Sequence, residues 1–214
     1  MMDIFKKDDF FTNPHQLRNI ALNLDWKTWK IAETPSFGGG WRGARSADLS
    51  TYNDPILDRA IKEVYGFAWD LMDLSNYIYP EWDNYDNLKK DSTCEFIKNR
   101  KILKPKISTY FHLWRKKSDL GYHDWYSRYH QDFLPAAGVV YLHENPPENT
   151  GTSIIDPLNN NFIHVDNKWN RFVVYNGYYP HGVSQSFGAG KEDSRLTLNF
   201  FIYFYAKLYQ TNKL

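Results

Sequence analysis

The sequence predicts a mainly β protein, an antiparallel sandwich or jelly roll, with helices placed before the sheet. Three observations support this fold class. The length of 214 residues suits one domain that can bury a sizeable core. Two amphipathic helix patterns come first in the chain. From Cys94 onward the chain changes to short segments rich in β-branched and aromatic residues, separated by turn residues.

The two helices are expected to begin where an N-cap residue precedes a proline. Asn13-Pro14 gives the first such start, and Asp54-Pro55 gives the second, whose helix is expected to run to about Leu74. The apolar residues after Asn13 recur at the i, i+3, i+4, i+7 spacing of one buried helix face: Leu17, Ile20, Ala21 and Leu24. Before the first helix, Asp9–Phe11 is expected to form a short strand.

Nine strands are expected in the second part of the chain. Their boundaries are Cys94–Lys98, Ile107–Trp114, Tyr126–Asp132, Gly138–His143, Thr152–Ile155, Phe162–Val165, Phe172–Tyr175, Gly182–Phe187 and Arg195–Tyr205. We therefore expect a single domain, with a helical N-terminal extension over residues 1–90 and a β core over residues 91–214.

Composition excludes several classes of protein. A formal net charge of +1 argues against a dedicated nucleic-acid binder. Cys94 is the only cysteine, which rules out an internal disulfide and a thiolate zinc cluster. The first residues, MMDIFKKDDFF, carry charges where a signal peptide needs an apolar core. The longest apolar run, near Phe200–Tyr205, is too short for a membrane helix. We expect a soluble protein in a reducing cytoplasm, with no membrane partner.

The segment GGGWRG within 36–45 matches the G-x-G-x-x-G pattern of dinucleotide-binding folds. That pattern needs a preceding strand and a helix that follows at once, and neither is expected here. We interpret the segment as a loop, either simply exposed or folded over an active site.

The candidate site begins at His130-Gln131-Asp132. Successive side chains on a strand point to opposite faces, so His130 and Asp132 share a face and Gln131 points away. A more distant histidine, His181, would complete a set of two histidines and one carboxylate, which leaves positions open on Fe(II). Arg195 and Thr197 share a face of the last strand, where a guanidinium fork would suit a carboxylate ligand.

Read together, these residues resemble the Fe(II)- and 2-oxoglutarate-dependent oxygenases, in particular a small bacterial and phage branch related to the prolyl hydroxylases. The resemblance rests on His130-x-Asp132, GVVYL, Gly151-Thr152-Ser153, NRFVVYNGYYPH ending at His181, and Arg195-x-Thr197, in that order. DDFFTNPHQLRNIAL and GGWRGARS also look like the opening segment of that branch. The resemblance implies a double-stranded β-helix, a cupin-like jelly roll.

The resemblance also implies residue roles and a reaction. His130, Asp132 and His181 would bind Fe(II), and Arg195 with Thr197 would bind the far carboxylate of the cosubstrate, 2-oxoglutarate. Tyr126 would add a hydrogen bond, with Tyr129 or Tyr110 as alternatives. The reaction would hydroxylate a substrate with O₂ and release succinate and CO₂.

The spacing of the metal ligands agrees with this fold. In a double-stranded β-helix the two ligand-bearing strands are neighbours in space, with four short strands between them in sequence. The gap from 130 to 181 is 51 residues, which suits four strands of five or six residues with turns. A competing set is His164, Asp166 and His181, but its gap leaves room for only one hairpin.

Other functions stay open at this stage. A non-catalytic jelly-roll binding module or phage structural protein is one alternative, and a cupin-type metalloenzyme that needs no 2-oxoglutarate is another. The substrate is a peptide, a nucleobase or a small metabolite, and Trp125, Tyr178 and Tyr179 are expected to flank the metal. We expect a monomer or homodimer, in the host cytoplasm if a phage encodes it.

Overall fold

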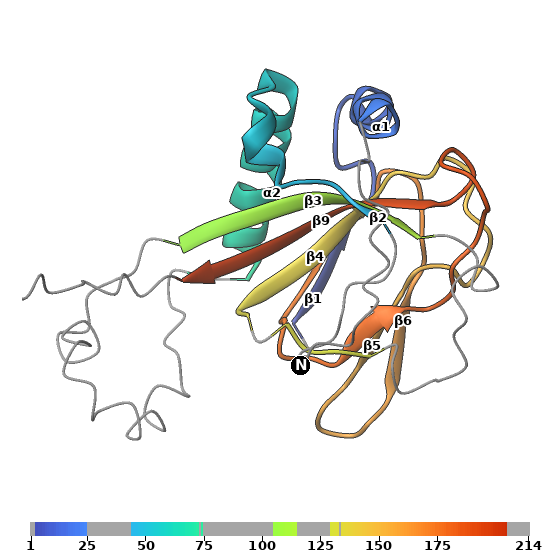
Figure 1. The fold of residues 1–214 in the computed structure, drawn as a ribbon. Coiled ribbons are helices and arrows are strands. Elements are labelled where there is room, and N and C mark those ends of the chain that lie inside the picture. Colours follow the sequence, from blue (N-terminus) through green and yellow to red (C-terminus); the bar gives the residue numbers. More distant parts are fainter. Residues whose placement is uncertain are drawn as a thin grey trace, which may run out of the picture.

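The computed structural model describes residues 3–24, 44–72, 74, 105–114, 129–132 and 134–204 (Figure 1). Within these ranges the elements are, in chain order, β1 (Ile4–Lys7), α1 (Pro14–Asn23), β2 (Ala44–Arg45), the short 3₁₀ helix η1 (Leu49–Tyr52), α2 (Pro55–Leu71), β3 (Pro105–Trp114), β4 (Ala136–Tyr141), β5 (Thr152–Ile155), β6 (Phe162–Val165), β7 (Phe172–Tyr175), β8 (His181–Val183) and β9 (Arg195–Phe204).

The described strands form two antiparallel sheets. The larger has six strands in the order β1-β7-β4-β9-β3-β2, and the smaller has three in the order β6-β5-β8. A bridge between His130 and His181 adds a short fourth segment beside β8. Figure 1 shows both helices on one side of the larger sheet and β5 and β6 on its other side. The expected mainly β jelly roll with helices is confirmed.

The last strand, β9, separates two buried layers because its side chains alternate between the faces of the larger sheet. Leu196, Leu198 and Phe200 pack in the core cluster that includes the helices. Phe201 belongs to a second cluster, between the two sheets. Arg195, at the start of β9, is on the same face as Phe201 by the two-residue period. The larger sheet therefore presents Arg195 to the interior between the sheets.

Both helices begin at the expected prolines. Asp54 accepts hydrogen bonds from the N–H groups of Ile56 and Leu57 at 2.7 and 3.2 Å, so it caps α2 as expected. The expected cap at Asn13 is wrong in detail, because its side chain makes no capping hydrogen bond and instead donates to Gln16 Oε1 at 3.3 Å. Helix α2 ends at Leu71, somewhat before the expected Leu74.

Several strand predictions need correction. The strand expected at Gly138–His143 lies two residues earlier, at Ala136–Tyr141. Asp9–Phe11 is not a strand, because Asp9 has a positive φ of 51° and the strand lies earlier, at Ile4–Lys7, paired with β7. Around His130 the described residues hold a single bridge rather than a full strand. The strand expected at Gly182–Phe187 is His181–Val183 and therefore shorter. The strand expected at Cys94–Lys98 and the whole GGGWRG segment lie outside the described residues.

The first 90 residues contribute more than helices. Strand β1 pairs with β7 and β2 pairs with β3, so both edges of the larger sheet come from this part of the chain. A boundary at residue 90 therefore does not separate helices from sheet.

Gly138 in β4 allows a close approach of its neighbours. A Cβ atom at this position would lie 2.2 Å from the Val173 carbonyl oxygen and 2.3 Å from Cζ of Phe200. Gly138→Ala is therefore expected to lower the free energy of unfolding by about 3 kcal/mol, measured by urea denaturation. Gly66→Ala in α2 is the matched control, because nothing lies within 4 Å of its new Cβ. It should stabilise the protein by up to about 1 kcal/mol. Equal effects of the two changes would contradict this packing.

An ion-pair network ties the N-terminal segment to the loop before β7. Asp8 lies 2.5 Å from Arg171 Nε and 2.8 Å from Lys168 Nζ. The hydrogen bond from Arg171, followed by the one from Lys168, holds the pKa of Asp8 well below its ordinary value. The contribution to stability is therefore complete above about pH 4 and is lost as the pH falls below it.

Asp8→Asn is expected to lower the free energy of unfolding by about 1 kcal/mol at pH 7, since the Asp8 side chain is 36% exposed and solvent weakens its ion pairs. The difference between the variant and the original protein should shrink as the pH falls from 4 to 2. Urea denaturation across this pH range checks it. A difference that does not depend on pH would show that packing, not charge, is responsible.

Candidate metal centre

Backbone hydrogen bonds bring His130 and His181 side by side. The His130 N–H donates to the His181 carbonyl at 3.0 Å, and the His181 N–H donates back at 2.9 Å. Asp132 is held by its N–H, which donates to the Gly177 carbonyl at 2.8 Å. Gln131 turns away and donates to the Tyr178 carbonyl at 2.6 Å. His130 and Asp132 therefore face one side, and β4 to β7 lie between them and His181 in sequence, as expected.

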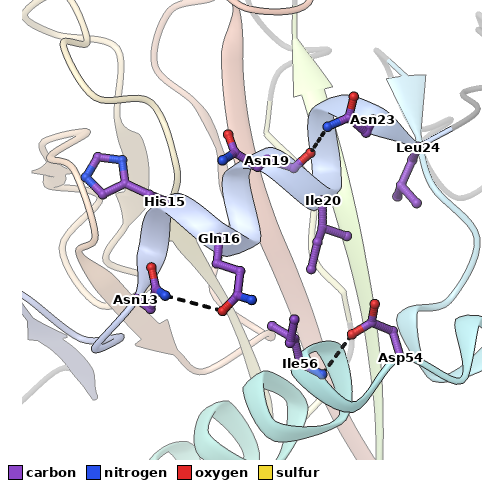
Figure 2. Close-up of a pocket in the computed structure, with 9 residues that line it drawn as sticks. All are labelled: Asn13, His15, Gln16, Asn19, Ile20, Asn23, Leu24, Asp54 and Ile56. Atoms are coloured by element: carbon purple, nitrogen blue, oxygen red, sulfur yellow. Dashed lines mark hydrogen bonds between the residues drawn. The ribbon is translucent and has the colours of Figure 1, made fainter.

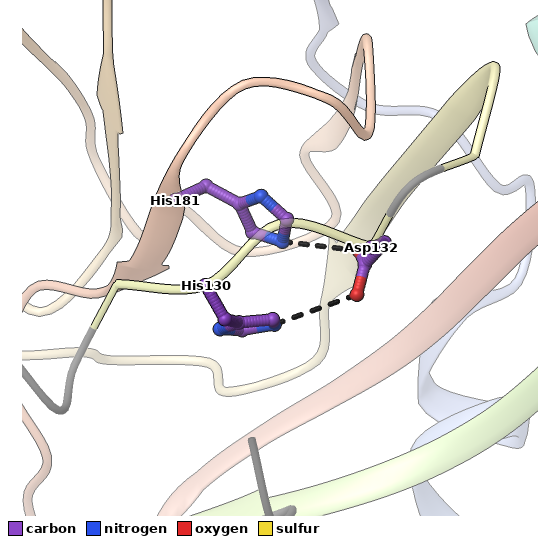
Figure 3. Close-up of side chains that lie close together, drawn as sticks. All are labelled: His130, Asp132 and His181. Atoms are coloured by element: carbon purple, nitrogen blue, oxygen red, sulfur yellow. Dashed lines mark ion pairs between the residues drawn. The ribbon is translucent and has the colours of Figure 1, made fainter. Parts of the chain in front are cut away.

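The three side chains point toward one another (Figure 3). Asp132 Oδ1 lies 3.5 Å from His130 Nε2, and Asp132 Oδ2 lies 3.1 Å from His181 Nε2. One ligand atom from each residue can be chosen so that all three lie within 4.8 Å of one another. Ligands at right angles about 2.1 Å from a metal are about 3 Å apart, which is close to the 3.5 and 3.1 Å distances from Asp132, so these residues could hold one metal ion.

An unsatisfied buried oxygen also fits a metal. Asp132 Oδ2 is buried and has no hydrogen-bond donor in the described structure, because the 3.1 Å contact with His181 lacks the geometry of a hydrogen bond. A buried carboxylate oxygen without a donor is costly unless a cation pairs with it. The arrangement of Asp132 is explained if a cation occupies this position.

The second histidine is oriented by its own backbone. His181 Nδ1 lies 2.8 Å from the Tyr179 carbonyl oxygen. A carbonyl only accepts hydrogen bonds, so Nδ1 carries a proton, and Nε2 is the ring nitrogen that faces Asp132. This is the arrangement that metal-binding histidines generally use.

Asp132 is ionised across the physiological pH range. Burial acts to raise the pKa of its carboxyl, but the close contacts with His130 and His181 outweigh burial and lower the pKa to about 2. The site therefore offers a carboxylate and imidazole nitrogens, a donor set that suits Fe(II) and related divalent ions.

Arg195 lies deep between the sheets, where it is 1% exposed. Its Nε donates to the Thr150 carbonyl at 3.2 Å, and its Nη2 lies 3.4 Å from Thr152 Oγ1. Burial lowers the pKa of the guanidinium. Among the described side chains no carboxylate forms an ion pair with it. A buried cation in this position is suited to an anionic ligand.

The register of β5 relates Arg195 to the histidines. Thr152 lies two residues from Ile154, which pairs directly with His181 in β8. Two residues of strand span about 7 Å. Because Arg195 Nη2 lies beside Thr152, the guanidinium is displaced from His181 by roughly 7 Å along the β5 strand direction.

The other predicted site residues have different positions. Thr197 is buried on the face of Arg195, but its hydroxyl lies 2.6 Å from Asn199 Oδ1 rather than against the guanidinium. Tyr126 and Trp125 lie outside the described residues. Of the two alternatives to Tyr126, Tyr129 contacts the ring of Phe162, and Tyr110 faces the interior beside Phe201.

A residue that the sequence analysis missed lies closer to Arg195. Tyr141 is fully buried at the end of β4, its hydroxyl lies 2.7 Å from Thr152 Oγ1, and the Arg195 guanidinium carbon is 5.4 Å from its ring centroid. Burial raises the pKa of Tyr141, so its hydroxyl stays neutral and can donate. In GVVYL, Tyr141 is two residues from Val139, and this spacing predicts that both side chains lie on the same face of the strand.

The competing pair lies elsewhere. His164 pairs in register with Ser153, whereas His181 pairs with the adjacent Ile154, so the two histidines lie on opposite faces of the smaller sheet. His164 Nε2 contacts Asp166 at 3.2 Å, and its Nδ1 contacts Ser184 Oγ at 2.9 Å. The structure therefore does not bring this pair to His181.

A hollow of about 650 Å³ lies between α1 and the start of α2 (Figure 2). Six of its nine lining residues have polar side chains; the nine are Asn13, His15, Gln16, Asn19, Ile20, Asn23, Leu24, Asp54 and Ile56. The helices cover the face of the larger sheet opposite to the smaller sheet (Figure 1), so this hollow is separate from the three metal-ligand candidates.

Neither a protein-family model nor a curated protein matches this chain. Among the described residues, no helix has the length and apolar content needed to cross a membrane.

Solved structures do match over almost the whole chain. A prolyl hydroxylase from Trichoplax adhaerens, in complex with a hypoxia inducible factor peptide, has a TM-score of 0.57 at 14% identity and covers 95% of this chain and 84% of its own. A Pseudomonas putida prolyl-4-hydroxylase has a TM-score of 0.51 at 12% identity, with 96% and 95% covered.

A third match is a dioxygenase for auxin oxidation from Arabidopsis thaliana, in a binary complex with 2-oxoglutarate. Its TM-score is 0.53 at 12% identity, and the match covers 96% of this chain and 84% of that one. At such low identity these matches concern the fold. The chain has the double-stranded β-helix fold of the 2-oxoglutarate-dependent oxygenases.

Proposed function

We propose that this protein is an Fe(II)- and 2-oxoglutarate-dependent dioxygenase that hydroxylates its substrate. In the balanced reaction, a substrate C–H bond, O₂ and 2-oxoglutarate become C–OH, succinate and CO₂. The observation that carries the proposal is the buried Arg195, which has no carboxylate partner among the described residues and lies near a metal-ligand set.

His130, Asp132 and His181 would hold the iron. The iron, when bound, supplies the chemistry that couples oxidation of 2-oxoglutarate to oxidation of the substrate. The protein's part is to fix three ligands and leave the remaining positions open. The hydrogen bond from His181 to the Tyr179 carbonyl orients the His181 imidazole, and the backbone hydrogen bonds of His130 hold its main chain beside His181.

Arg195 would bind the far carboxylate of 2-oxoglutarate. A guanidinium fork matches a carboxylate in two parallel hydrogen bonds. The distance of about 7 Å between the levels of Thr152 and His181 is comparable to the length of a five-carbon diacid. Tyr141 and Thr152 would add hydroxyl donors, and Tyr141 rather than Tyr126 is our candidate for the assisting tyrosine. Thr197 would support this group from the same strand face.

The alternative functions explain less of the site. A binding module without catalysis does not need a buried carboxylate oxygen that lacks a donor. A cupin-type metalloenzyme without a cosubstrate leaves the buried charge of Arg195 without a counter-ion among the residues that the structure describes. The matched structures include one with a peptide and one named for auxin oxidation, so the shared fold does not select a substrate. Membership of a bacterial or phage branch and a place in a reducing cytoplasm remain predictions.

Formation of succinate tests the proposal. Protein loaded anaerobically with Fe(II) and then given 2-oxoglutarate and O₂ should form succinate slowly even without substrate, because these enzymes turn over their cosubstrate uncoupled. Omitting Fe(II) or O₂ should stop it. Iron-loaded protein that binds its metal but forms no succinate under any condition would contradict the proposal.

A further inference from the structure

Arg18, in the middle of α1, joins two separate segments of backbone. Its Nη1 donates to the Leu142 carbonyl at 2.8 Å, and its Nη2 donates to the Glu192 carbonyl at 2.7 Å. Its Nε lies 3.6 Å from Glu144 Oε1, and its side chain is only 11% exposed. A charged donor makes a stronger hydrogen bond to a carbonyl than a neutral donor does. Arg18 therefore holds the residue after β4 next to the loop before β9.

The loop at residues 188–194, which contains Glu192, is closed on itself. Asp193 accepts hydrogen bonds from the N–H groups of Ala189 and Gly190 at 3.2 and 2.6 Å. The Ser194 hydroxyl donates to the Gly190 carbonyl. Gly188 has a positive φ of 76°, and a Cβ atom there would lie 2.1 Å from the Asp193 carbonyl oxygen. Because these contacts make the 188–194 loop compact, holding one of its residues holds the loop as a whole.

A second contact ties the same loop to α1 from the opposite direction. Lys191 Nζ donates to the Leu22 carbonyl at 2.7 Å and to the Leu24 carbonyl at 3.2 Å. These carbonyls lie at the C-terminal end of α1, where carbonyls lack a partner within the helix. Arg18 reaches from the helix to the loop, and Lys191 reaches from the loop to the helix. The 188–194 loop is therefore fixed against α1 at two points.

Both segments that Arg18 joins lead directly to Arg195. The Leu142 N–H donates to the Leu196 carbonyl at 2.9 Å, which extends the pairing of β4 with β9 by one residue. Glu192 is three residues before Arg195 in the chain. Arg195 and Leu196 are both buried. The position of the Arg195 guanidinium depends on where β9 begins, and the contacts of Arg18 fix that point.

We propose that Arg18 is a positioning residue that sets the place of the Arg195 guanidinium between the sheets. The inference rests on the proposed function, in which Arg195 binds the far carboxylate of 2-oxoglutarate. Two parallel hydrogen bonds to a carboxylate tolerate only small displacements, so an Arg195 that shifts with a loosened 188–194 loop binds this carboxylate more weakly. The hydrogen bonds of Arg18 go to Leu142 and Glu192 rather than to the metal-ligand candidates, so iron binding should not depend on it.

Arg18→Met tests this, because methionine keeps the apolar stem of the side chain and removes its donors. The 2-oxoglutarate concentration needed for half-maximal succinate formation should rise about tenfold. The maximal rate and the Fe(II) affinity should stay within about twofold of the original values. Arg18→Lys keeps a charge that can reach one carbonyl, so its requirement should lie in between. Lys191→Met loosens the same loop from the other side and should raise the requirement by itself.

Hydrogen exchange, followed by NMR, reports on the start of β9 without metal or turnover. Two protons are informative in the metal-free full chain: the Arg195 Nε–H, which donates to the Thr150 carbonyl, and the Leu142 N–H. The Nε–H signal is assigned by its loss in Arg195→Lys. Relative to the Val139 N–H in the interior of β4, Arg18→Met should speed the exchange of both protons at least about tenfold.

Asp54→Ala is the matched control for a general loss of stability, because it removes the cap of α2. It should leave the 2-oxoglutarate requirement and the relative exchange rates unchanged. An equal acceleration at Val139 in Arg18→Met, or an unchanged 2-oxoglutarate requirement in that variant, overturns the inference. If the original protein forms no succinate, the oxygenase proposal fails, whereas the exchange rates still decide whether Arg18 holds the start of β9.

Discussion

Replacing Asp132 by alanine is expected to weaken Fe(II) binding by more than about 100-fold and to abolish succinate formation. Loss of a residue that merely supports a ligand already costs about 10–100-fold in metal affinity, and Asp132 would be a ligand itself. Its two oxygens also hold the contacts with both histidines, at 3.5 and 3.1 Å. Anaerobic titration with Fe(II) against a competing chelator measures the affinity.

Asp166→Ala is the matched control for this change. Asp166 also follows a histidine by two residues and also contacts its ring, but it lies on the other face of the smaller sheet and its side chain is 72% exposed. Its removal should leave both iron binding and turnover unchanged. Asp132→Asn keeps the shape of the side chain and should still weaken iron binding. Retention of iron affinity and turnover in both Asp132 variants would refute the ligand assignment.

Replacing Arg195 by alanine is expected to raise the 2-oxoglutarate concentration needed for half-maximal succinate formation by about 30-fold to more than 1000-fold. Removing one partner of a buried charge pair costs about 2–5 kcal/mol, and each 1.4 kcal/mol is tenfold in affinity. Affinity for Fe(II) should be unaffected, because Arg195 contacts Thr150 and Thr152 rather than the triad.

Two further variants sharpen the Arg195 result. Arg195→Lys keeps a charge but loses the planar fork, so its 2-oxoglutarate requirement should lie between those of the original protein and Arg195→Ala. Arg59→Ala, exposed on α2, should have no effect. An unchanged requirement for 2-oxoglutarate in Arg195→Ala would remove Arg195 from the cosubstrate site.

The sequence was sufficient for those features that depend on local patterns. Alternation of side chains along a strand placed His130 and Asp132 on one side, and the gap to His181 allowed the four intervening strands that the structure contains. The cap at Asp54 followed from residue type and position. Each of these depends on a few neighbouring residues or on a simple count of strands.

Features that depend on pairing between distant strands were not predictable in this way. The position of Tyr141 beside Arg195 becomes visible only when β4, β5 and β9 are placed together, because its hydroxyl contacts Thr152 while its ring faces Arg195. Its alternation with Val139 indicates which strand face it is on, but this does not single it out among sixteen tyrosines. Asn13 has the residue type of a cap, but a side-chain contact with Gln16 competes with capping. The strand predicted at Asp9–Phe11 does not form because Asp9 has a positive φ. Aspartate tolerates this backbone conformation, but its presence cannot be predicted from the residue type.

The most direct test of the oxygenase proposal is an anaerobic titration of metal-free protein with Fe(II) and then with 2-oxoglutarate, followed by visible absorption. We predict that the weak charge-transfer band of iron-chelated 2-oxoglutarate appears, that it is absent in His130→Ala, and that Arg195→Ala requires far more 2-oxoglutarate to develop it. Iron binding without the band would contradict the role of 2-oxoglutarate, and a protein that binds no iron would contradict the metal centre itself.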